Sequence, residues 1–394
     1  MTVLAQPQVR ARTRGAVLDS APARPRPDWV LVAVTGAILV IGTLLVWSST
    51  SHNDQLTAGH PTEYLRKQLV NVAIGIGLAA AVVVTDRRWV RILAPFVYVG
   101  SVVGLLLVLV MGSTINGSRS WLMLGGMSIQ PAEFAKLAVV VGMALLVAER
   151  TESSRTRRVG STEVIGMLLI AGLPALLILL QPDLGTMLVL SATVFGVLAV
   201  AGTPQRWMAT LAAAGLAGAV LVFTAGLLKT YQIHRFLAFM EPDLDPRGAG
   251  YNTTQARIAI GNGGLFGQGL FGGSQTRSGF VPEQHTDFVF TVAGEELGLI
   301  GAGVLILLFA VLLARALRIA LTAEDLFGKV AAAGIACWFG FQTFQNIGMC
   351  LGIMPVTGVP LPLVSYGGSS MFASLMAIGL LLNIQMKSTA RRAA

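Results

Sequence analysis

Ten long apolar segments constrain the fold of this chain more than any other feature. About 20 consecutive apolar residues span the hydrocarbon layer of a membrane as a helix. The runs lie near residues 29–49, 68–85, 92–111, 132–148, 163–180, 184–202, 207–228, 288–317, 327–350 and 367–386. The fifth and sixth are divided only by 181-QPD-183 and could instead form one long broken helix. With 54% hydrophobic and 12% charged residues, the composition predicts an all-α polytopic membrane protein with ten transmembrane helices.

The positive charges predict how these helices are oriented. If the N-terminus is cytoplasmic, 19 of the 28 Lys and Arg residues fall in segments inside the cell, eight fall outside, and Lys136 lies within a span. This bias follows the positive-inside rule and places both termini in the cytoplasm. The net charge of +9 is therefore mainly a topology signal. We expect no nucleic-acid binding, because no basic face with interleaved aromatic residues is found.

The same pattern divides the chain into three parts. Residues 1–28 are rich in Arg, Pro and Ala and are predicted to form a disordered basic cytoplasmic tail. Residues 29–386 form a single transmembrane domain, and residues 387–394 form a cytoplasmic C-terminal tail. Between the seventh and eighth spans lies an extracytoplasmic loop, 229–287, whose length is typical of functional loops.

An acidic cluster, 281-VPEQHTDFVFTVAGEELG-298, leads into the eighth span. Ionisable groups are costly to bury in a membrane, so they indicate a functional site. We place Asp287 at the outer end of this helix, with Glu295 about 80° round from it and Glu296 on the opposite face. Asp287 and one glutamate could then share a cavity, where Asp287 would act as a general base or a metal ligand. The alternatives are that Asp287 caps the helix and that the glutamates only stabilise the fold.

Other polar residues recur within or beside the predicted spans. Glu133 and Lys136 lie three residues apart on one helix face and are predicted to pair. This pair could neutralise itself in the protein interior, position a charged group, or do both. Asp183 could cap the sixth span or belong to the site.

Two loops on the outer side carry further candidates. The glycine-rich stretch 251–269 could be a flexible loop or a segment folded back into a cavity to contact substrate. The segment 352–371 holds several prolines and glycines, and irregular backbone at membrane depth is tolerated where it lines a cavity. Its Ser365, Ser369 and Ser370 are suited to binding phosphate oxygens.

The motifs together resemble the SEDS family (shape, elongation, division and sporulation) over nearly all of 29–386. The motifs that carry the resemblance are 116-NGSRSW-121, 128-SIQPAEFAK-136, 181-QPDLGT-186, 231-YQIHRFLAFMEPDLDPRGAGYNTTQARIAIGNGGLFGQG-269, 281-VPEQHTDFVFTVAGEELG-298, 346-NIGM-349 and 355-PVTGVPLPLVSYGGSSM-371. The resemblance implies a bacterial plasma-membrane glycosyltransferase that polymerises lipid II into β-1,4 glycan strands at the outer face. Overall similarity favours the member acting in cell elongation, with the division member as the alternative.

The resemblance also implies roles for particular residues. It makes Asp287 the catalytic residue and places Glu133 and Lys136 in the same cavity, where we add Glu295, Glu296 and Asp183 as supporting residues. We expect a divalent cation, Mg²⁺ or Mn²⁺, with Asp287 as a possible ligand. The implied partners are undecaprenyl-pyrophosphate-linked glycan and a class B penicillin-binding protein. Our candidates for binding pyrophosphate are Lys136, Arg119, Arg235, Arg257, Ser365, Ser369 and Ser370.

One departure and two alternatives accompany this prediction. Gln284 stands where the family often has Arg, which removes one expected positive charge beside Asp287. A lipid II flippase would be expected to show broken helices near the midplane and an internal repeat. The polar groups gather instead toward the outer face, which favours an enzyme. A catalytically silent scaffold is disfavoured because Asp287, Glu133 and Lys136 are all present.

Overall fold

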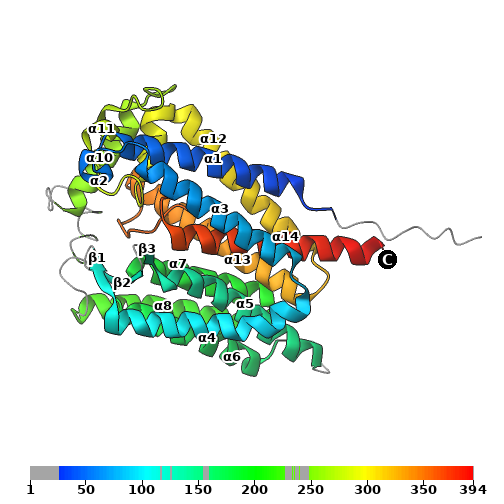
Figure 1. Ribbon diagram of the computed structural model, residues 1–394. Coiled ribbons are helices and arrows are strands. Elements are labelled where there is room, and N and C mark those ends of the chain that lie inside the picture. The colour runs from blue at the N-terminus through cyan, green and yellow to red at the C-terminus, as the bar shows by residue number, and fades with distance from the viewer. Residues whose placement is uncertain are drawn as a thin grey trace, which may run out of the picture.

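The computed structural model describes residues 26–115, 118–124, 127–153, 159–226, 233, 235, 239 and 248–393. They form a bundle of long helices with short helices and strands gathered at one end (Figure 1). The long helices are α1 (Trp29–Ser51), α3 (Glu63–Val84), α4 (Arg87–Met111), α5 (Pro131–Ser153), α6 (Ser161–Leu180), α7 (Leu184–Ala201), α8 (Gln205–Thr224), α12 (Val289–Thr322), α13 (Leu326–Leu351) and α14 (Gly368–Ala393). The short elements are α2 (Asp54–Thr57), α10 (Ala249–Asn262), α11 (Ser274–Ser278), β1 (Ser113–Ile115), β2 (Ser118–Leu124) and β3 (Met127–Ile129).

Each predicted span corresponds to one long helix, and the fifth and sixth are separate helices, α6 and α7, rather than one broken helix. Within the described residues, nine helices are long and apolar enough to cross a membrane. The exception is α13, which carries Gln342, Gln345 and Asn346 at zero exposure. Because α13 packs against α5, α7 and α12, it can carry polar side chains that would be costly against lipid.

The ends of the bundle differ in structure. Figure 1 shows the start of α1 and the end of α14 at one end, while α10, α11 and the strands lie at the other. The last helix continues through residues 387–393, which were predicted as a tail. The predicted disordered tail falls largely on residues 1–25, outside the described part of the chain.

A three-stranded antiparallel sheet occupies most of the loop between α4 and α5. Its order is β1-β2-β3, with Trp121 opposite Ser113 and Leu122 opposite Ile129. The sheet brings Gln130 and the first turn of α5 toward the start of α14, because the backbone N–H of Gln130 donates to Ser369 Oγ at 2.9 Å.

The long helix α12 is broken at Gly298, which has a φ of 67°. The glycine-rich stretch 263–269 lies against this break. The backbone N–H groups of Gln268 and Gly269 donate to the carbonyls of Glu295 and Glu296, each at 3.0 Å. In return, the N–H of Leu299 donates to Gly264 at 2.9 Å. The stretch thus satisfies backbone groups that the break would otherwise leave unpaired.

Candidate active site

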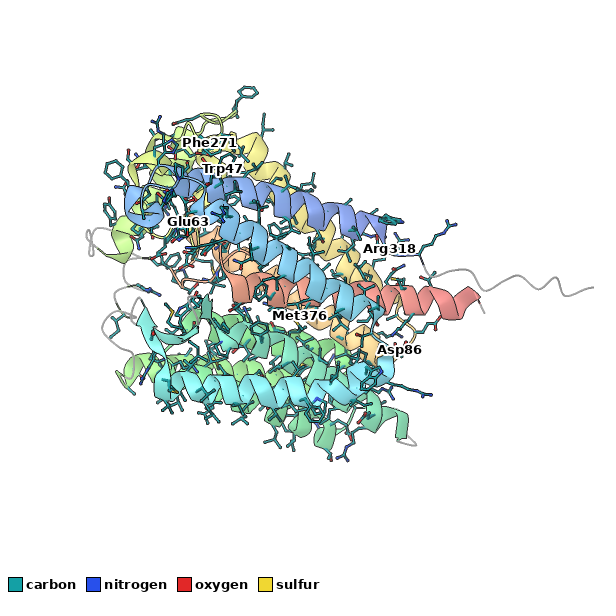
Figure 2. All side chains as sticks on the ribbon, in the orientation of Figure 1. Trp47, Glu63, Asp86, Phe271, Arg318 and Met376 are labelled. Atoms are coloured by element: carbon teal, nitrogen blue, oxygen red, sulfur yellow. The ribbon has the colours of Figure 1, made fainter. Side chains whose placement is uncertain are left out.

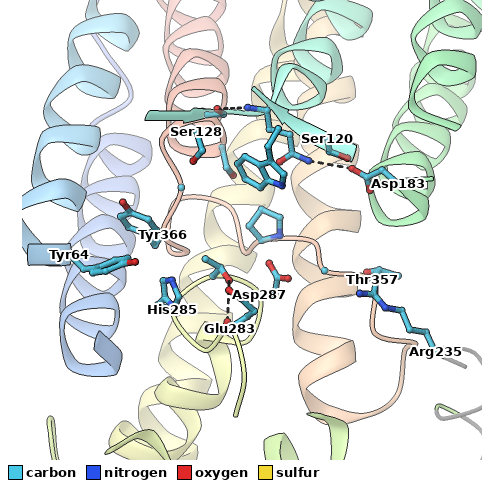
Figure 3. Close-up of a pocket in the computed structure, with 18 residues that line it drawn as sticks. Tyr64, Ser120, Ser128, Asp183, Arg235, Glu283, His285, Asp287, Thr357 and Tyr366 are labelled. Carbon is cyan, nitrogen blue, oxygen red and sulfur yellow. Dashed lines mark hydrogen bonds between the residues drawn. The ribbon is translucent and has the colours of Figure 1, made fainter. Parts of the chain in front are cut away.

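A polar cavity opens at the end of the bundle that carries the strands (Figure 3). Its volume is about 360 Å³. Separate parts of the chain contribute to its wall: Tyr64, Ser120, Trp121, Ser128, Gln130, Asp183, Arg235, Glu283, His285, Thr286, Asp287, Thr357, Gly358, Pro360, Tyr366, Gly367, Ser369 and Ser370. Several of these residues are hydroxyl-bearing or charged, so the cavity is suited to a polar ligand.

Asp287 lies in a tight turn immediately before α12. The carbonyl of Glu283 accepts the N–H groups of Thr286 and Asp287 at 3.1 and 3.0 Å. Glu283 itself has a φ of 51°, the left-handed conformation that non-glycine residues seldom adopt. Helix α12 starts at Val289, and its N-cap Phe288 makes no side-chain cap. Asp287 therefore lies at the outer end of α12, as predicted, but in the turn before the helix rather than on it. The alternative that Asp287 caps the helix is wrong, and the helical angles to Glu295 and Glu296 do not apply.

Burial and nearby charges together shift the pKa of Asp287. The side chain is half-buried, and loss of hydration raises the pKa of Asp287 to about 7. The carboxylates of Glu283 and Asp183 contribute to this rise, and the guanidinium of Arg235 opposes it. A carboxyl group with a pKa near neutrality is suited to exchange protons with a bound hydroxyl.

An aromatic group forms one side of the cavity. Tyr64 contacts His285 edge to face, with ring centroids 5.1 Å apart, and lies 4.8 Å from the ring of Tyr366. Burial lowers the pKa of His285, although the Glu283 carboxylate partly opposes this, so the imidazole is neutral at pH 7. Figure 3 shows these three rings on one side of Asp287 and Arg235 on the other.

Positive potential comes from Arg235 and from the start of α14. Gly367, Ser369 and Ser370 of this helix start line the cavity. The N-terminus of a long helix presents backbone N–H groups and a partial positive charge, which favour phosphate oxygens. Asp183 also lines the cavity, while its carboxylate caps α7 through the N–H and hydroxyl of Thr186 at 3.0 and 2.8 Å. Its two predicted roles therefore occur together.

Polar side chains of α13 hold the irregular segment 352–367, part of which lines the cavity. Asn346 Nδ2 donates to the carbonyls of Asp287 and Val359 at 2.7 and 2.8 Å. Gln345 Nε2 donates to Pro355 O, and Gln342 Nε2 donates to Pro360 O. The segment between α13 and α14 is irregular, as predicted, and its Thr357, Gly358 and Pro360 line the cavity.

Glu133 and Lys136 form the predicted ion pair, but neither side chain lines the cavity. Lys136 Nζ lies 2.7 Å from Glu133 Oε1 and 2.8 Å from Gln342 Oε1, and both charged side chains are almost fully buried. Trp338 Nε1 also donates to Gln342 Oε1. The pair therefore contacts the site only indirectly. Gln342 accepts from Lys136 and also donates to the carbonyl of Pro360, which lines the cavity.

Glu295 and Glu296 also lie away from the cavity wall. The Glu295 carboxylate accepts the N–H groups of Gln275 and Thr276 at 2.7 and 2.9 Å, so it caps the start of α11. Glu296 Oε1 accepts the Ser48 hydroxyl at 2.6 Å. These glutamates anchor the loop before α12 and are not paired with Lys136. The stretch 251–269 likewise packs on α12 instead of entering the cavity, contrary to the prediction that it contacts substrate.

The remaining phosphate candidates separate into two groups. Arg235, Ser369 and Ser370 line the cavity. Arg119 donates to the carbonyls of Gly112 and Val110, Arg257 donates to those of Leu351 and Gly352, and the Ser365 hydroxyl donates to Thr286 O. These last three stabilise backbone at the edge of the site.

The aromatic side of the cavity was not predicted, and Gln284 lies outside the cavity wall. Tyr64 lies just before the second predicted span, 68–85, and outside the motifs. Tyr366 falls within the motif 355–371, but neither tyrosine was singled out. Gln284 points away from the cavity, since its Nε2 donates to Ser49 O and Thr276 O. Gln284 therefore does not contribute to the cavity wall.

Comparisons with known proteins agree with this architecture. The family model described as Cell cycle protein, covering FtsW, RodA and SpoVE, matches residues 28–390. The chain belongs to the SEDS family. The predicted family and the polytopic helical fold are thus confirmed, and the chain is a multi-pass plasma-membrane protein and a glycosyltransferase.

Several relatives illustrate the range of the family. Stage V sporulation protein E of Bacillus subtilis is 38% identical, covering 92% of this chain and 98% of the relative. Probable peptidoglycan glycosyltransferase FtsW of Aeromonas salmonicida is 37% identical, with 93% and 92% covered. Peptidoglycan glycosyltransferase MrdB of Escherichia coli K12 is 34% identical, with 91% and 93% covered. These identities do not single out elongation or division.

Two solved structures share the fold of this SEDS protein. One is a chain of a peptidoglycan synthase complex that coordinates polymerization and crosslinking, with a TM-score of 0.75, 35% identity, and 92% and 98% of the two chains covered. The other is RodA of Thermus thermophilus, with a TM-score of 0.65, 34% identity, and 91% and 96% covered.

Proposed function

We propose that this SEDS protein polymerises lipid II into β-1,4 glycan strands at the outer face of the plasma membrane, in cell elongation. The observation that carries the proposal is the Asp287 carboxyl, which lines an open polar cavity and has a pKa raised to about 7. Strands β2 and β3, which contribute to the cavity wall, lie at the end of the bundle opposite both described chain ends (Figure 1). Because the basic segments favour a cytoplasmic location for those chain ends, this arrangement supports a cavity that faces outside.

The proposed reaction is one inverting transfer. The Asp287 carboxylate takes the proton of the GlcNAc 4-hydroxyl of incoming lipid II while that oxygen attacks the anomeric carbon of the donor. The bond from this carbon to the pyrophosphate breaks, and its electron pair leaves with undecaprenyl pyrophosphate. Arg235 and the start of α14 stabilise the departing negative charge. The α-linked donor thereby becomes a β-1,4 linkage.

The divalent cation, Mg²⁺ or Mn²⁺, belongs to the same proposal. Within the described part of the chain, no three His, Cys, Asp or Glu side chains group to hold a metal ion. Magnesium is often held by one or two carboxylates together with substrate phosphates. Asp287 would be the protein ligand in that arrangement, and the role of general base would then pass to another group.

A class B penicillin-binding protein is the proposed partner. The support comes from the structural likeness to a chain of a synthase complex that coordinates polymerization and crosslinking. Such a partner would crosslink the strands that this chain makes.

Polymerisation of labelled lipid II by the purified protein tests the function. Wild-type protein with Mg²⁺ yields glycan strands on a gel, with and without a cognate transpeptidase as separate arms, and chelation with EDTA stops the reaction. Asp287→Asn is expected to fold normally and make no strands. Asp86→Asn is the matched control, because Asp86 is exposed at the opposite end of the bundle (Figure 2).

Three outcomes would contradict the proposal. Strand synthesis by Asp287→Asn near the wild-type rate would exclude Asp287 as base or metal ligand. Transfer of labelled lipid II between the leaflets of proteoliposomes, unaffected by Asp287→Asn and without strand synthesis, would indicate a flippase. A scaffold would show neither activity.

A further inference from the structure

A second polar cavity lies at the end of the bundle opposite Asp287, where α1, α12 and α14 meet. Its volume is about 230 Å³, and its wall includes Asp28, Arg315, Arg318 and Ser388. Figure 2 labels Arg318 at this end of the molecule. We propose that this cavity binds the phosphate headgroup of an anionic phospholipid.

The charges in this cavity match a single phosphodiester. Asp28 caps α1 by accepting the N–H groups of Val30 and Leu31, each at 3.1 Å. Its other oxygen accepts Arg315 Nε at 2.8 Å, so this buried carboxylate is neutralised within the protein. The remaining charge of Arg318 gives the cavity a net charge of +1. This complements the single negative charge of a phosphodiester.

The guanidinium of Arg318 is the group available to the ligand. Its side chain is exposed, and no hydrogen bond or ion pair of this guanidinium is found among the described residues. The hydroxyls of Thr322 and Ser388 donate to carbonyls of their own helices at 2.8 and 2.9 Å. Donors for an anion therefore come from the arginines, whose planar N–H groups suit phosphate.

An apolar strip beside Arg318 favours a lipid over a free phosphate. Ala314, Leu307 and Ile300 precede Arg318 on α12 by four, 11 and 18 residues. At 100° per residue, all three lie within about 40° of Arg318 around the helix. All are exposed, with Leu307 at 62% and Ile300 at 53%. An acyl chain on this strip would place its headgroup at the cavity. The alternative is that Arg318 only extends its guanidinium from the membrane into water. That role would not require a polar cavity beside it.

Native mass spectrometry of the full chain in detergent tests this site. The probes are phosphatidylglycerol and phosphatidylcholine with identical acyl chains. The wild-type protein should bind phosphatidylglycerol more tightly. Arg318→Gln should weaken phosphatidylglycerol binding about fivefold, as expected for one interfacial charge, and leave phosphatidylcholine binding unchanged. Arg318→Lys keeps the charge and should retain most of the affinity.

Arg88→Gln is the matched control, because Arg88 is exposed near the same end of the bundle, at the start of α4. An equal loss in Arg88→Gln would indicate diffuse surface attraction and overturn the proposal. Equal binding of the two lipids would overturn it too. Displacement of phosphatidylglycerol by soluble glycerol 3-phosphate would show a site for free phosphate instead. None of these readouts depends on lipid II polymerisation.

Discussion

Burial, two carboxylates and one arginine act together on the ionisation of Asp287. A raised pKa means that the carboxyl is protonated below neutral pH and ionised above it. Only the ionised form can accept a proton from a hydroxyl. We therefore expect kcat/KM for strand synthesis to rise with pH through about 7 and then level off.

Substitutions of the neighbouring charges should move this midpoint in opposite directions. Glu283→Gln removes a negative charge that disfavours ionisation, so the acidic limb should shift to lower pH. Arg235→Gln removes a positive charge that favours ionisation, so the limb should shift to higher pH. The measurement is kcat/KM from pH 5 to 9 for each purified variant. Shifts of both variants in the same direction would contradict this electrostatic account.

At this scale the sequence predicted residue types but not side-chain directions. Glu133 and Lys136 were predicted to pair because a three-residue spacing on a helix fixes their proximity. Sequence spacing could not show that Arg235 lines the cavity while Arg119 and Arg257 do not. Whether an arginine faces a cavity or a carbonyl of a distant helix end depends on tertiary contacts.

At the level of elements, the spans were predictable because each needs a long apolar run. Their observed limits differ from the predicted ones by a few residues at most ends, with larger extensions at the starts of α3 and α4 and at the ends of α5, α12 and α14. The break at Gly298 was not predicted. It depends on hydrogen bonds with residues 264–269, which are about 30 positions away in the sequence. The short strands were missed because they lie in a loop with little apolar periodicity.

Gly267 tests whether the glycine-rich stretch supports the break in α12. It has a φ of 80°, and a Cβ there would collide with the backbone of Glu296. Gly264, with a φ of 54°, has nothing within 4 Å of such a Cβ. Gly264→Ala should cost about 1–2 kcal/mol for the left-handed conformation alone. Gly267→Ala adds a steric cost of about 1–3 kcal/mol.

Thermal melting of the two purified variants in detergent measures this difference. Gly267→Ala should lower the melting temperature clearly more than Gly264→Ala, which serves as the control for backbone conformation. Equal melting temperatures would show that the close approach of this stretch to α12 adds nothing to stability.

Across the whole molecule, the cavity is assembled from segments that are distant in sequence and meet over α13. Over a membrane-spanning length this helix is less apolar than the other long helices, yet its buried amides hold Asp287 and the segment 355–360 in place. These amides stand in the sequence as polar residues within an otherwise apolar run. The sequence could not indicate that their acceptors are carbonyls in irregular backbone, because those positions follow only from the complete packing.

Asn346 is the side chain that joins Asp287 to that segment, so Asn346→Ala should impair catalysis as well as stability. Loss of the amide leaves the carbonyls of Asp287 and Val359 without this donor, at a cost of roughly 1–3 kcal/mol. A displacement of Asp287 by about 1 Å can cost on the order of 100-fold in rate. We expect kcat per folded molecule to fall by about that factor.

Asn383 provides the matched control. Its Nδ2 donates to the carbonyls of Val82, Val83 and Thr85 at 2.9, 2.9 and 2.8 Å, and it is buried like Asn346. It lies near the end of α3 that is remote from the cavity. Asn383→Ala should therefore lower the melting temperature to a similar extent while kcat per folded molecule stays near wild type. If both variants lose kcat equally, the effect of Asn346 is general destabilisation. If Asn346→Ala keeps its full rate, the turn that carries Asp287 is held in place without this amide.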